Sequence, residues 1–175
     1  LSERPDELKK TDKIIFPGVG EAKAAMEVLS RTGLSDMLSE FVLTGKLLLG
    51  ICLGCQVIFE FSEERNTKCL GILPGKVKKF TSDLGLKVPH MGWNTITIEK
   101  EHWIMRNIPE HTSFYFVHSY YPLPEDARLI LTRTEYGIRF ASGVYKENVI
   151  AFQFHPEKSG EHGLQLLHNF IVEDR

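Results

Sequence analysis

The feature that most constrains this chain is a short apolar run that ends in a glycine-flanked cysteine. Residues 47–56 read LLLGICLGCQ. A run of this length and polarity is typical of a buried strand, and the segment that follows has helical periodicity. Gly50 and Gly54 flank Cys52, where a Cβ on either side would crowd a sharp turn. The pattern therefore predicts strand, turn and helix with a thiol at the turn, which is the context of a nucleophile elbow.

Other interpretations of the thiol have to be weighed first. A single cysteine is most often an inert buried hydrophobe. Cys52 and Cys55 also form a C-x-x-C pair, but Cys69 is the only other cysteine, so a zinc site lacks its second ligand pair. A redox pair remains an alternative, because C-x-x-C also opens the helix of thioredoxin-like sites. Both glycines favour the elbow, where the positive end of the helix is expected to stabilise the thiolate.

The composition sets limits on the class of protein. With 175 residues, the chain can form one domain with a sizeable core. A net charge of −2 gives no electrostatic case for binding nucleic acid or an anionic membrane. The odd number of cysteines, three, argues against a disulfide scaffold and for a reducing compartment. No run approaches the roughly 20 apolar residues of a membrane span, and no export signal is visible. We therefore expect a cytoplasmic protein.

The order of the expected elements predicts the fold class. The first part of the chain reads as strand 12–16, helix 21–31, a second helix ending near Gly45, strand 46–51 and helix 53–61. This alternation implies parallel strands with crossover helices. Short β-rich runs then follow at 77–80, 94–98, 113–120, 128–134, 140–145 and 149–154, and a helix at 160–173 closes the chain. We expect a single α/β domain over 1–175, with a mixed, mainly parallel central sheet flanked by helices and a β-rich second half.

A nucleophilic thiol needs a base, and the base needs a group that orients it. His155 follows the apolar run 149–154, at the strand end where catalytic groups of parallel sheets gather. Glu157 lies two residues further on, and the proline between them stiffens the link. A His-Pro-Glu segment alone would be read as an exposed turn. Together with the elbow, it predicts a catalytic triad of Cys52, His155 and Glu157.

Negative charge that develops during attack on a carbonyl needs fixed donors. The N–H of Leu53, directly after the thiol, is the usual first donor of an elbow. The PGVG segment (17–20) follows the first expected strand and is placed to supply a second donor from the Gly18–Val19 peptide. This segment lacks the lysine and glycine spacing of a phosphate-binding loop. An ordinary glycine-rich turn is the alternative.

Polar residues recur along the expected helix after the thiol. Gln56, Glu60 and Glu63 or Glu64 follow Cys52 at steps of three and four, which would place them on one helical face. An amide and carboxylates on that face would suit a small zwitterionic substrate. For Glu60 and Glu63 taken singly, solvation is the better interpretation.

These segments resemble a known family. GICLGCQ (50–56), FQFHPEKSG (152–160) and PGVG (17–20) are similar to the triad-type, class I glutamine amidotransferases. HMGWNTI (90–96) and FYFVHSYY (114–121) narrow the resemblance to the glutaminase subunits of imidazole glycerol phosphate synthase. The resemblance implies that Cys52 attacks the side-chain amide of L-glutamine, that His155 protonates the leaving ammonia, and that water releases glutamate. It implies no metal and no cofactor.

The resemblance also implies a partner and further site residues. Ammonia would pass to a separate (β/α)₈ cyclase subunit of a heterodimer in histidine biosynthesis. Two sets of residues are implied: the glutamine site would include Gln56, Glu64, Ser119 and Tyr120, and the subunit interface Trp93, Asn94 and Lys158. Cys55 departs from the family, which often has methionine there. The family also opens with a strand, helix and strand, roughly 30 to 40 residues, that this sequence lacks.

We therefore expect a truncated or fragmentary chain, poorly stable alone, with uncovered apolar faces around DKIIF (12–16) and LLLGI (47–51). Three other functions remain alternatives. The chain could serve another amidotransferase, such as one that amidates a sugar, it could be an inactive paralogue, or it could be a thiol oxidoreductase that uses Cys52 and Cys55.

Overall fold

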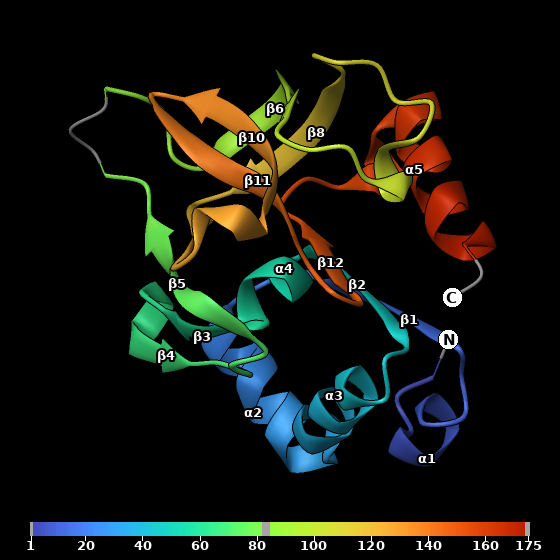
Figure 1. Cartoon of the computed structure of the whole chain (residues 1–175). Coiled ribbons are helices and arrows are strands. Elements are labelled where there is room, and N and C mark those ends of the chain that lie inside the picture. Colours follow the sequence, from blue (N-terminus) through green and yellow to red (C-terminus); the bar gives the residue numbers. More distant parts are fainter. Residues whose placement is uncertain (1, 82–84, 174–175) are drawn as a thin grey trace.

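The structure, a computed structural model, describes residues 2–81 and 85–173. Its centre is a six-stranded sheet with the strand order β1-β2-β12-β11-β10-β7 (Figure 1). In that order the strands are β1 (Lys13–Gly18), β2 (Leu47–Cys52), β12 (Val149–Phe152), β11 (Ile138–Lys146), β10 (Ile130–Tyr136) and β7 (Thr97–Ile98). Helices lie on both sides of this sheet (Figure 1). They are α1 (Pro5–Leu8), α2 (Ala22–Thr32), α3 (Leu34–Leu43), α4 (Leu53–Val57) and α5 (Gly160–Val172).

The α/β class and the mixed sheet are confirmed, but the parallel part of the sheet is smaller than expected. Only β2 has parallel neighbours on both sides, namely β1 and β12. The pairs β12–β11, β11–β10 and β10–β7 are antiparallel. Short turns cause this difference: β10 and β11 are separated by Gly137 alone, and residues 147–148 join β11 to β12. Connections of that length permit only antiparallel pairing.

Two smaller sheets form the remainder of the β structure. One has the order β4 (Thr67–Lys68), β3 (Phe59–Ser62), β5 (Leu73–Lys79) and β9 (Tyr120–Pro124). The other pairs β6 (His90–Thr95) with β8 (Ser113–His118). Single 3₁₀ turns occur at η1 (Glu64–Asn66), η3 (Trp103–Met105), η4 (Ala127–Leu129) and η5 (Pro156–Lys158). No helix of the described residues is long and apolar enough to cross a membrane.

The expected helix over 53–61 is wrong in its second half. Helix α4 ends at Val57, and residues 59–62 form β3, which pairs with β4 and β5. Phe59 is fully buried in this strand. Strand pairing between distant segments outweighs the helical spacing of the local sequence, which is a weak predictor of structure.

Strand β2 divides the core into two clusters. Leu48 packs in one cluster with residues of α2 and α3, including Leu29 and Phe41. Its neighbours Leu47 and Leu49 pack in the other cluster, which contains residues of α5 and β8. Alternate residues of a strand face opposite sides of the sheet, so β2 is covered on both faces.

The expectation of an uncovered face is therefore wrong for β2, whose residues are all buried. It holds in part for β1, the terminal strand of the sheet, where Ile15 is 39% exposed.

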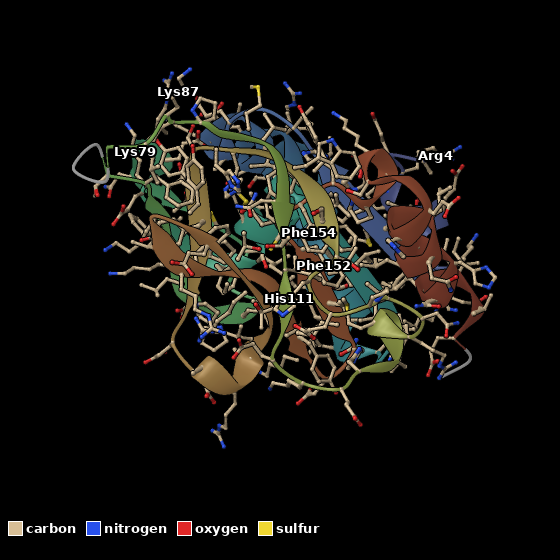
Figure 2. All side chains as sticks on the ribbon, turned by 90° about the horizontal axis from the view of Figure 1, so that it is seen from above. Arg4, Lys79, Lys87, His111, Phe152 and Phe154 are labelled. Carbon is tan, nitrogen blue, oxygen red and sulfur yellow. The ribbon has the colours of Figure 1, made fainter. Side chains whose placement is uncertain are left out.

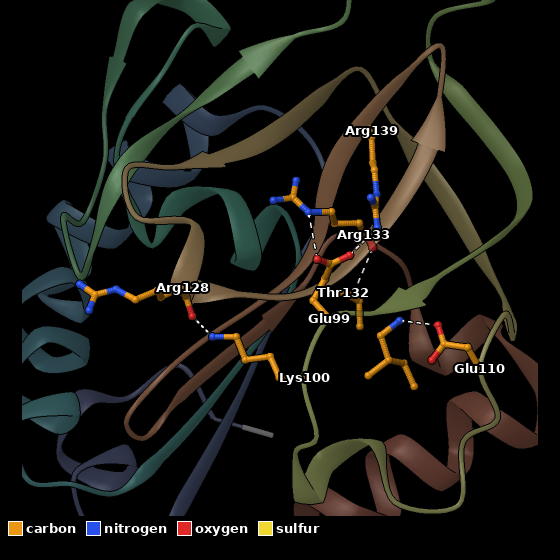
Figure 3. A network of polar contacts seen from close by, with 9 residues as sticks. Glu99, Lys100, Glu110, Arg128, Thr132, Arg133 and Arg139 are labelled. Atoms are coloured by element: carbon orange, nitrogen blue, oxygen red, sulfur yellow. Dashed lines mark hydrogen bonds and ion pairs between the residues drawn. The ribbon is translucent and has the colours of Figure 1, made fainter.

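Buried aromatic residues fill the interior of the molecule, whereas polar contacts support the far edge of the sheet. Phe152 and Phe154 lie in the middle of the molecule, while Arg4 and Lys79 lie at its periphery (Figure 2). At the edge, β7 is only two residues long. Polar contacts supplement its short pairing: Glu99 binds Arg133 at 3.5 Å and Arg139 at 2.6 Å, as Figure 3 shows.

Candidate active site

The turn between β2 and α4 has the geometry of an elbow. Cys52 joins the two elements with φ 53° and ψ −106°. Residues other than glycine rarely adopt a backbone conformation with such a positive φ. Close packing holds this conformation in place. A Cβ on Gly54 would overlap the carbonyl oxygen of Phe16 in β1. A Cβ on Gly50 would lie 3.0 Å from the carbonyl group of Gly54 and 3.1 Å from the side chain of Ala151. Gly54 is thus required by sterics, and a side chain at Gly50 would fit only if its neighbours moved by a few tenths of an ångström.

The thiol of Cys52 is held in its neutral form, contrary to the expected thiolate. Burial raises its pKa to about 11, and the nearby Glu157 carboxylate acts in the same direction. A hydrogen bond from the backbone N–H of Leu53 lowers the pKa by a smaller amount, as does the charge of Lys158. Helix α4 is only five residues long, so its N-terminus does little to offset the loss of water around the sulfur. To act as a nucleophile, this thiol therefore needs a base.

His155 is arranged to act as that base. Its Nδ1 lies 2.7 Å from Oε1 of Glu157, and a carboxylate accepts hydrogen bonds, so Nδ1–H is the donor. In the neutral ring the lone pair is then on Nε2. This atom is buried and has no hydrogen-bond partner within the described part of the chain. A buried, unpartnered basic nitrogen in a pocket is suited to proton transfer.

The segment around His155 is fixed by its backbone. The strand β12 ends at Phe152, earlier than the expected residue 154, and His155 stands in the turn before η5. Its N–H donates to the carbonyl of Tyr115 at 2.9 Å. Its own carbonyl accepts from the hydroxyl of Ser159 at 2.5 Å. These bonds fix the backbone at His155, and the hydrogen bond from Nδ1 to Glu157 orients the ring.

A cavity of about 370 Å³ brings most of the expected residues together. Its lining is made by Val19, Gly20, Cys52, Leu53, Gln56, Glu64, Pro89, Val117, His118, Ser119, Tyr120 and His155. The expected triad members Cys52 and His155 are both included, as are four residues assigned to glutamine by the resemblance. Gly18 does not line the cavity, but it pairs with Cys52 across the parallel β1–β2 register.

Gln56 and Glu64 reach the cavity by a different route from the one expected. Gln56 lies on α4, whereas Glu64 lies in η1, beyond β3. The Glu64 carboxylate accepts from the backbone N–H of Ala22, at the start of α2, at 2.6 Å. Glu60 and Glu63 instead accept from backbone N–H groups of Gly75 and Lys79 in β5 or at its end. The single helical face expected for these polar residues is therefore absent, although Gln56 and Glu64 both line the cavity.

Sequence reasoning missed two polar residues of the site. Gln153 is fully buried; its amide nitrogen lies 3.9 Å from the sulfur of Cys52, and its carbonyl oxygen accepts from Gln56 at 2.9 Å. His118 lines the cavity and is 5% exposed. Both residues lie within the quoted segments FQFHPEKSG and FYFVHSYY, but a motif alone does not show which side chains face the thiol.

The residues expected at a partner interface lie on β6 and η5, which both contact β8. Trp93 is 59% exposed, and its ring packs edge-on against Tyr115, whose carbonyl holds His155. Lys158 is exposed on η5. Asn94 is only partly exposed, and its amide nitrogen donates to the carbonyl of Glu135 at 2.9 Å. Trp93 and Lys158 are therefore available for contact, whereas Asn94 is largely used within the fold.

The geometry disfavours a redox pair. All three cysteines are unpaired, and Cys55 is fully buried, where a cysteine is usually structural and unreactive. Burial also raises the pKa of the Cys55 thiol well above its ordinary range, which removes the nucleophilic thiolate.

Nearly the whole chain matches a known family. The class-I glutamine amidotransferase family model matches residues 2–173. The chain belongs to this family. It is 46% identical over 177 residues to imidazole glycerol phosphate synthase subunit HisH of Neisseria gonorrhoeae, covering 98% of this chain and 83% of that protein. The HisH subunit of Dehalococcoides mccartyi strain 195 is 46% identical over 172 residues, with the same coverage.

Solved structures share the fold. A crystal structure of a glutamine amidotransferase superposes with a TM-score of 0.69 at 21% identity, covering 98% of this chain and 85% of that one. The glutaminase domain of CTPS from Trypanosoma brucei, with bound acivicin, gives a TM-score of 0.63 at 17% identity, covering 98% and 75%. The class I fold expected from the sequence is therefore confirmed.

Proposed function

We propose that this chain is the glutaminase subunit of an imidazole glycerol phosphate synthase and acts in histidine biosynthesis. The observation that carries the proposal is its 46% identity, over 98% of its length, to the HisH subunits. The reaction is hydrolysis of L-glutamine to glutamate and ammonia. The cavity next to Cys52 supports this reaction, since its volume of about 370 Å³ can hold a small amino acid.

Cys52, His155 and Glu157 carry out the chemistry in this proposal. Nε2 of His155 takes the thiol proton as the sulfur of Cys52 attacks the glutamine side-chain amide. The same proton then goes to the departing ammonia, which leaves a γ-glutamyl thioester. Water, activated by His155, cleaves the thioester and restores the thiol. Glu157 keeps the proton of His155 on Nδ1, so that Nε2 can act as base and then as acid.

The remaining site residues bind charge. The N–H of Leu53 and the Gly18–Val19 peptide stabilise the tetrahedral oxyanion. The α-amino and α-carboxylate groups of glutamine are held by Gln56, Glu64, Ser119 and Tyr120. The carboxylate of Glu64 supplies the negative charge that an ammonium group requires.

The partner in this proposal is a (β/α)₈ cyclase subunit, which receives the ammonia and forms a heterodimer with this chain in the cytoplasm. Trp93 offers an exposed aromatic anchor for that interface, with Asn94 next to it in β6 and Lys158 on η5, which contacts the same strand, β8. The three free thiols are consistent with a reducing compartment.

Glutamate release tests the proposal. The wild type and Cys52→Ala are assayed with glutamine, with and without a cyclase subunit and its ribonucleotide substrate. Cys69→Ala is the matched control, because Cys69 lies outside the cavity. We expect Cys52→Ala to lose at least about 1,000-fold in rate, as removal of a catalytic nucleophile does, while Cys69→Ala keeps the wild-type rate. Equal rates for the wild type and Cys52→Ala would refute the proposal.

A further inference from the structure

Two buried histidines connect the surface strand β6 to the glutamine cavity. His118 Nδ1 lies 2.7 Å from the carbonyl oxygen of Tyr120, and His118 Nε2 lies 2.9 Å from Nδ1 of His90. Nε2 of His90 is 3.2 Å from the amide nitrogen of Asn94. At the other end, the Tyr120 carbonyl also accepts from the amide nitrogen of Gln56 at 3.1 Å. The histidines therefore share an acceptor with a residue that lines the cavity.

The proton positions in this chain of bonds follow from simple hydrogen-bonding rules. A carbonyl oxygen can only accept, so Nδ1 of His118 carries the hydrogen. Burial lowers the pKa of His118 to about 3 and that of His90 to about 4, so both rings are neutral near pH 7. Nε2 of His118 is then an acceptor, and Nδ1 of His90 must donate to it. Nε2 of His90 accepts in turn from Asn94.

One consistent set of protons thus satisfies every ring nitrogen of the pair. Both histidines carry their hydrogen on Nδ1, and both donate toward the cavity. The amide of Asn94 is itself fixed, since its nitrogen also donates to the Glu135 carbonyl at 2.9 Å and its oxygen accepts from the N–H of Thr95 at 2.8 Å.

The rings themselves cannot turn freely. His90 stacks between Phe116 and Tyr136, with ring centroids 4.8 Å and 4.0 Å away. His118 packs against Phe80 and Phe140 at 5.3 Å and 5.4 Å. Aromatic packing of this kind fixes the planes of the imidazoles, so the directions of their hydrogen bonds are fixed as well.

We propose that His90 and His118 are positioning residues for glutamine binding, and that His118 acts by holding the Tyr120 carbonyl where it fixes the amide of Gln56. The inference rests on the proposed function, because it assigns Gln56 and Tyr120 to the substrate. Neither histidine takes part in proton transfer. Their removal therefore weakens binding of glutamine more than it slows the chemical steps.

Variants of His118 separate positioning from packing. An asparagine side chain can place an N–H near the position of Nδ1, whereas glutamine places its amide near Nε2. His118→Gln therefore loses the donor to Tyr120, and His118→Asn keeps it, while both lose the imidazole packing. We expect KM for glutamine to rise about 5- to 10-fold in His118→Gln, the usual effect of one lost hydrogen bond. In His118→Asn, KM stays within about twofold of the wild type, and kcat changes less than about threefold in both.

Phe170→Leu is the matched control, because Phe170 is buried in the same core cluster but lies on α5, away from the hydrogen-bond chain. It is expected to lower the melting temperature without raising KM. Kinetics are normalised to the fraction of active sites, so that partial unfolding does not imitate a change in kcat. An unchanged KM in His118→Gln, or an equal rise in His118→Asn, would overturn the proposal.

Imidazole ¹⁵N NMR of the full wild-type chain provides a readout that does not depend on activity. We expect protonated Nδ1 and bare Nε2 in both His90 and His118 at pH 7. A hydrogen on Nε2 of His118 would overturn the proposal whatever the kinetics. If the wild type does not hydrolyse glutamine at all, the proposed function fails, whereas the NMR result still decides the arrangement of the pair.

Discussion

The neutral state of Cys52 leads to a prediction about its reactivity. Its pKa of about 11 leaves roughly 0.1% thiolate at pH 8, whereas an ordinary cysteine near 9 has roughly 10%. This difference lowers the thiolate population about 100-fold. A thiolate of higher pKa is also more nucleophilic, with a Brønsted slope of about 0.4–0.5, which returns roughly 6- to 10-fold over two pKa units. We therefore expect alkylation of Cys52 to be about 10- to 15-fold slower than that of a free thiol at pH 8.

The shape of the pH profile is a sharper test than the rate at one pH. Iodoacetamide labelling of the folded chain is followed by mass spectrometry of the peptide that contains Cys52, between pH 6 and pH 10. The logarithm of the rate should rise with unit slope over this whole range, because the thiol stays mostly protonated. Cys52→Ala gives the background from Cys55 and Cys69, which are both buried.

A different resting state would give a different profile. If His155 held the sulfur as a thiolate–imidazolium pair, the rate would already be high and flat above about pH 5, as in cysteine proteases. A plateau that begins below pH 9 would contradict the argument that burial dominates the pKa of Cys52. Unit slope to pH 10 would mean that proton transfer to His155 occurs only as the substrate is attacked.

Two substitutions test how the site is held together. Gly54→Ala should lower the free energy of unfolding, measured by urea denaturation, by about 3 kcal/mol or more, because the added Cβ overlaps the backbone of Phe16. The control Gly33→Ala should lower it by only about 1 kcal/mol, because Gly33 has φ 74° but open space around it. Equal losses in the two variants would contradict the steric argument. Glu157→Gln should lower kcat for glutamine about 100-fold with little change in KM, because it removes the carboxylate that fixes the tautomer of His155. An unchanged kcat would show that this carboxylate is dispensable.

The elbow could be predicted from the sequence because its requirements are local. Gly54 is required and Gly50 is tightly packed where β2, Cys52 and α4 meet, and the spacing of these residues is visible in the sequence. His155 and Glu157 were equally accessible, since the hydrogen bond between them spans two residues. The class I fold followed from the same segments, and solved glutamine amidotransferase structures share it.

Features that depend on distant contacts could not be predicted. The pKa of Cys52 was expected to fall, because the helix N-terminus is visible in sequence whereas burial by other parts of the chain is not. The route of Glu64 to the cavity depends on β3, which pairs with segments further along the chain. Gln153 contacts Gln56 across 97 residues of sequence. Local patterns contain no information about which of these partners will meet.

Close packing between β1 and α4 also places the two proposed oxyanion donors next to each other. Gly54 packs against Phe16 so tightly that α4 and β1 leave no room for a methyl group between them. Two residues further along β1, a Cβ on Gly18 would lie 3.0 Å from the side chain of Leu53 and 3.3 Å from the nitrogen of Gly54. The positions of the peptide after Gly18 and of the N–H of Leu53 are therefore fixed together by the packing of β1 against α4. A shift of β1 relative to α4 would separate the two proposed donors. Cys52 could then still attack the amide, but the negative charge on the tetrahedral intermediate would lose its stabilisation.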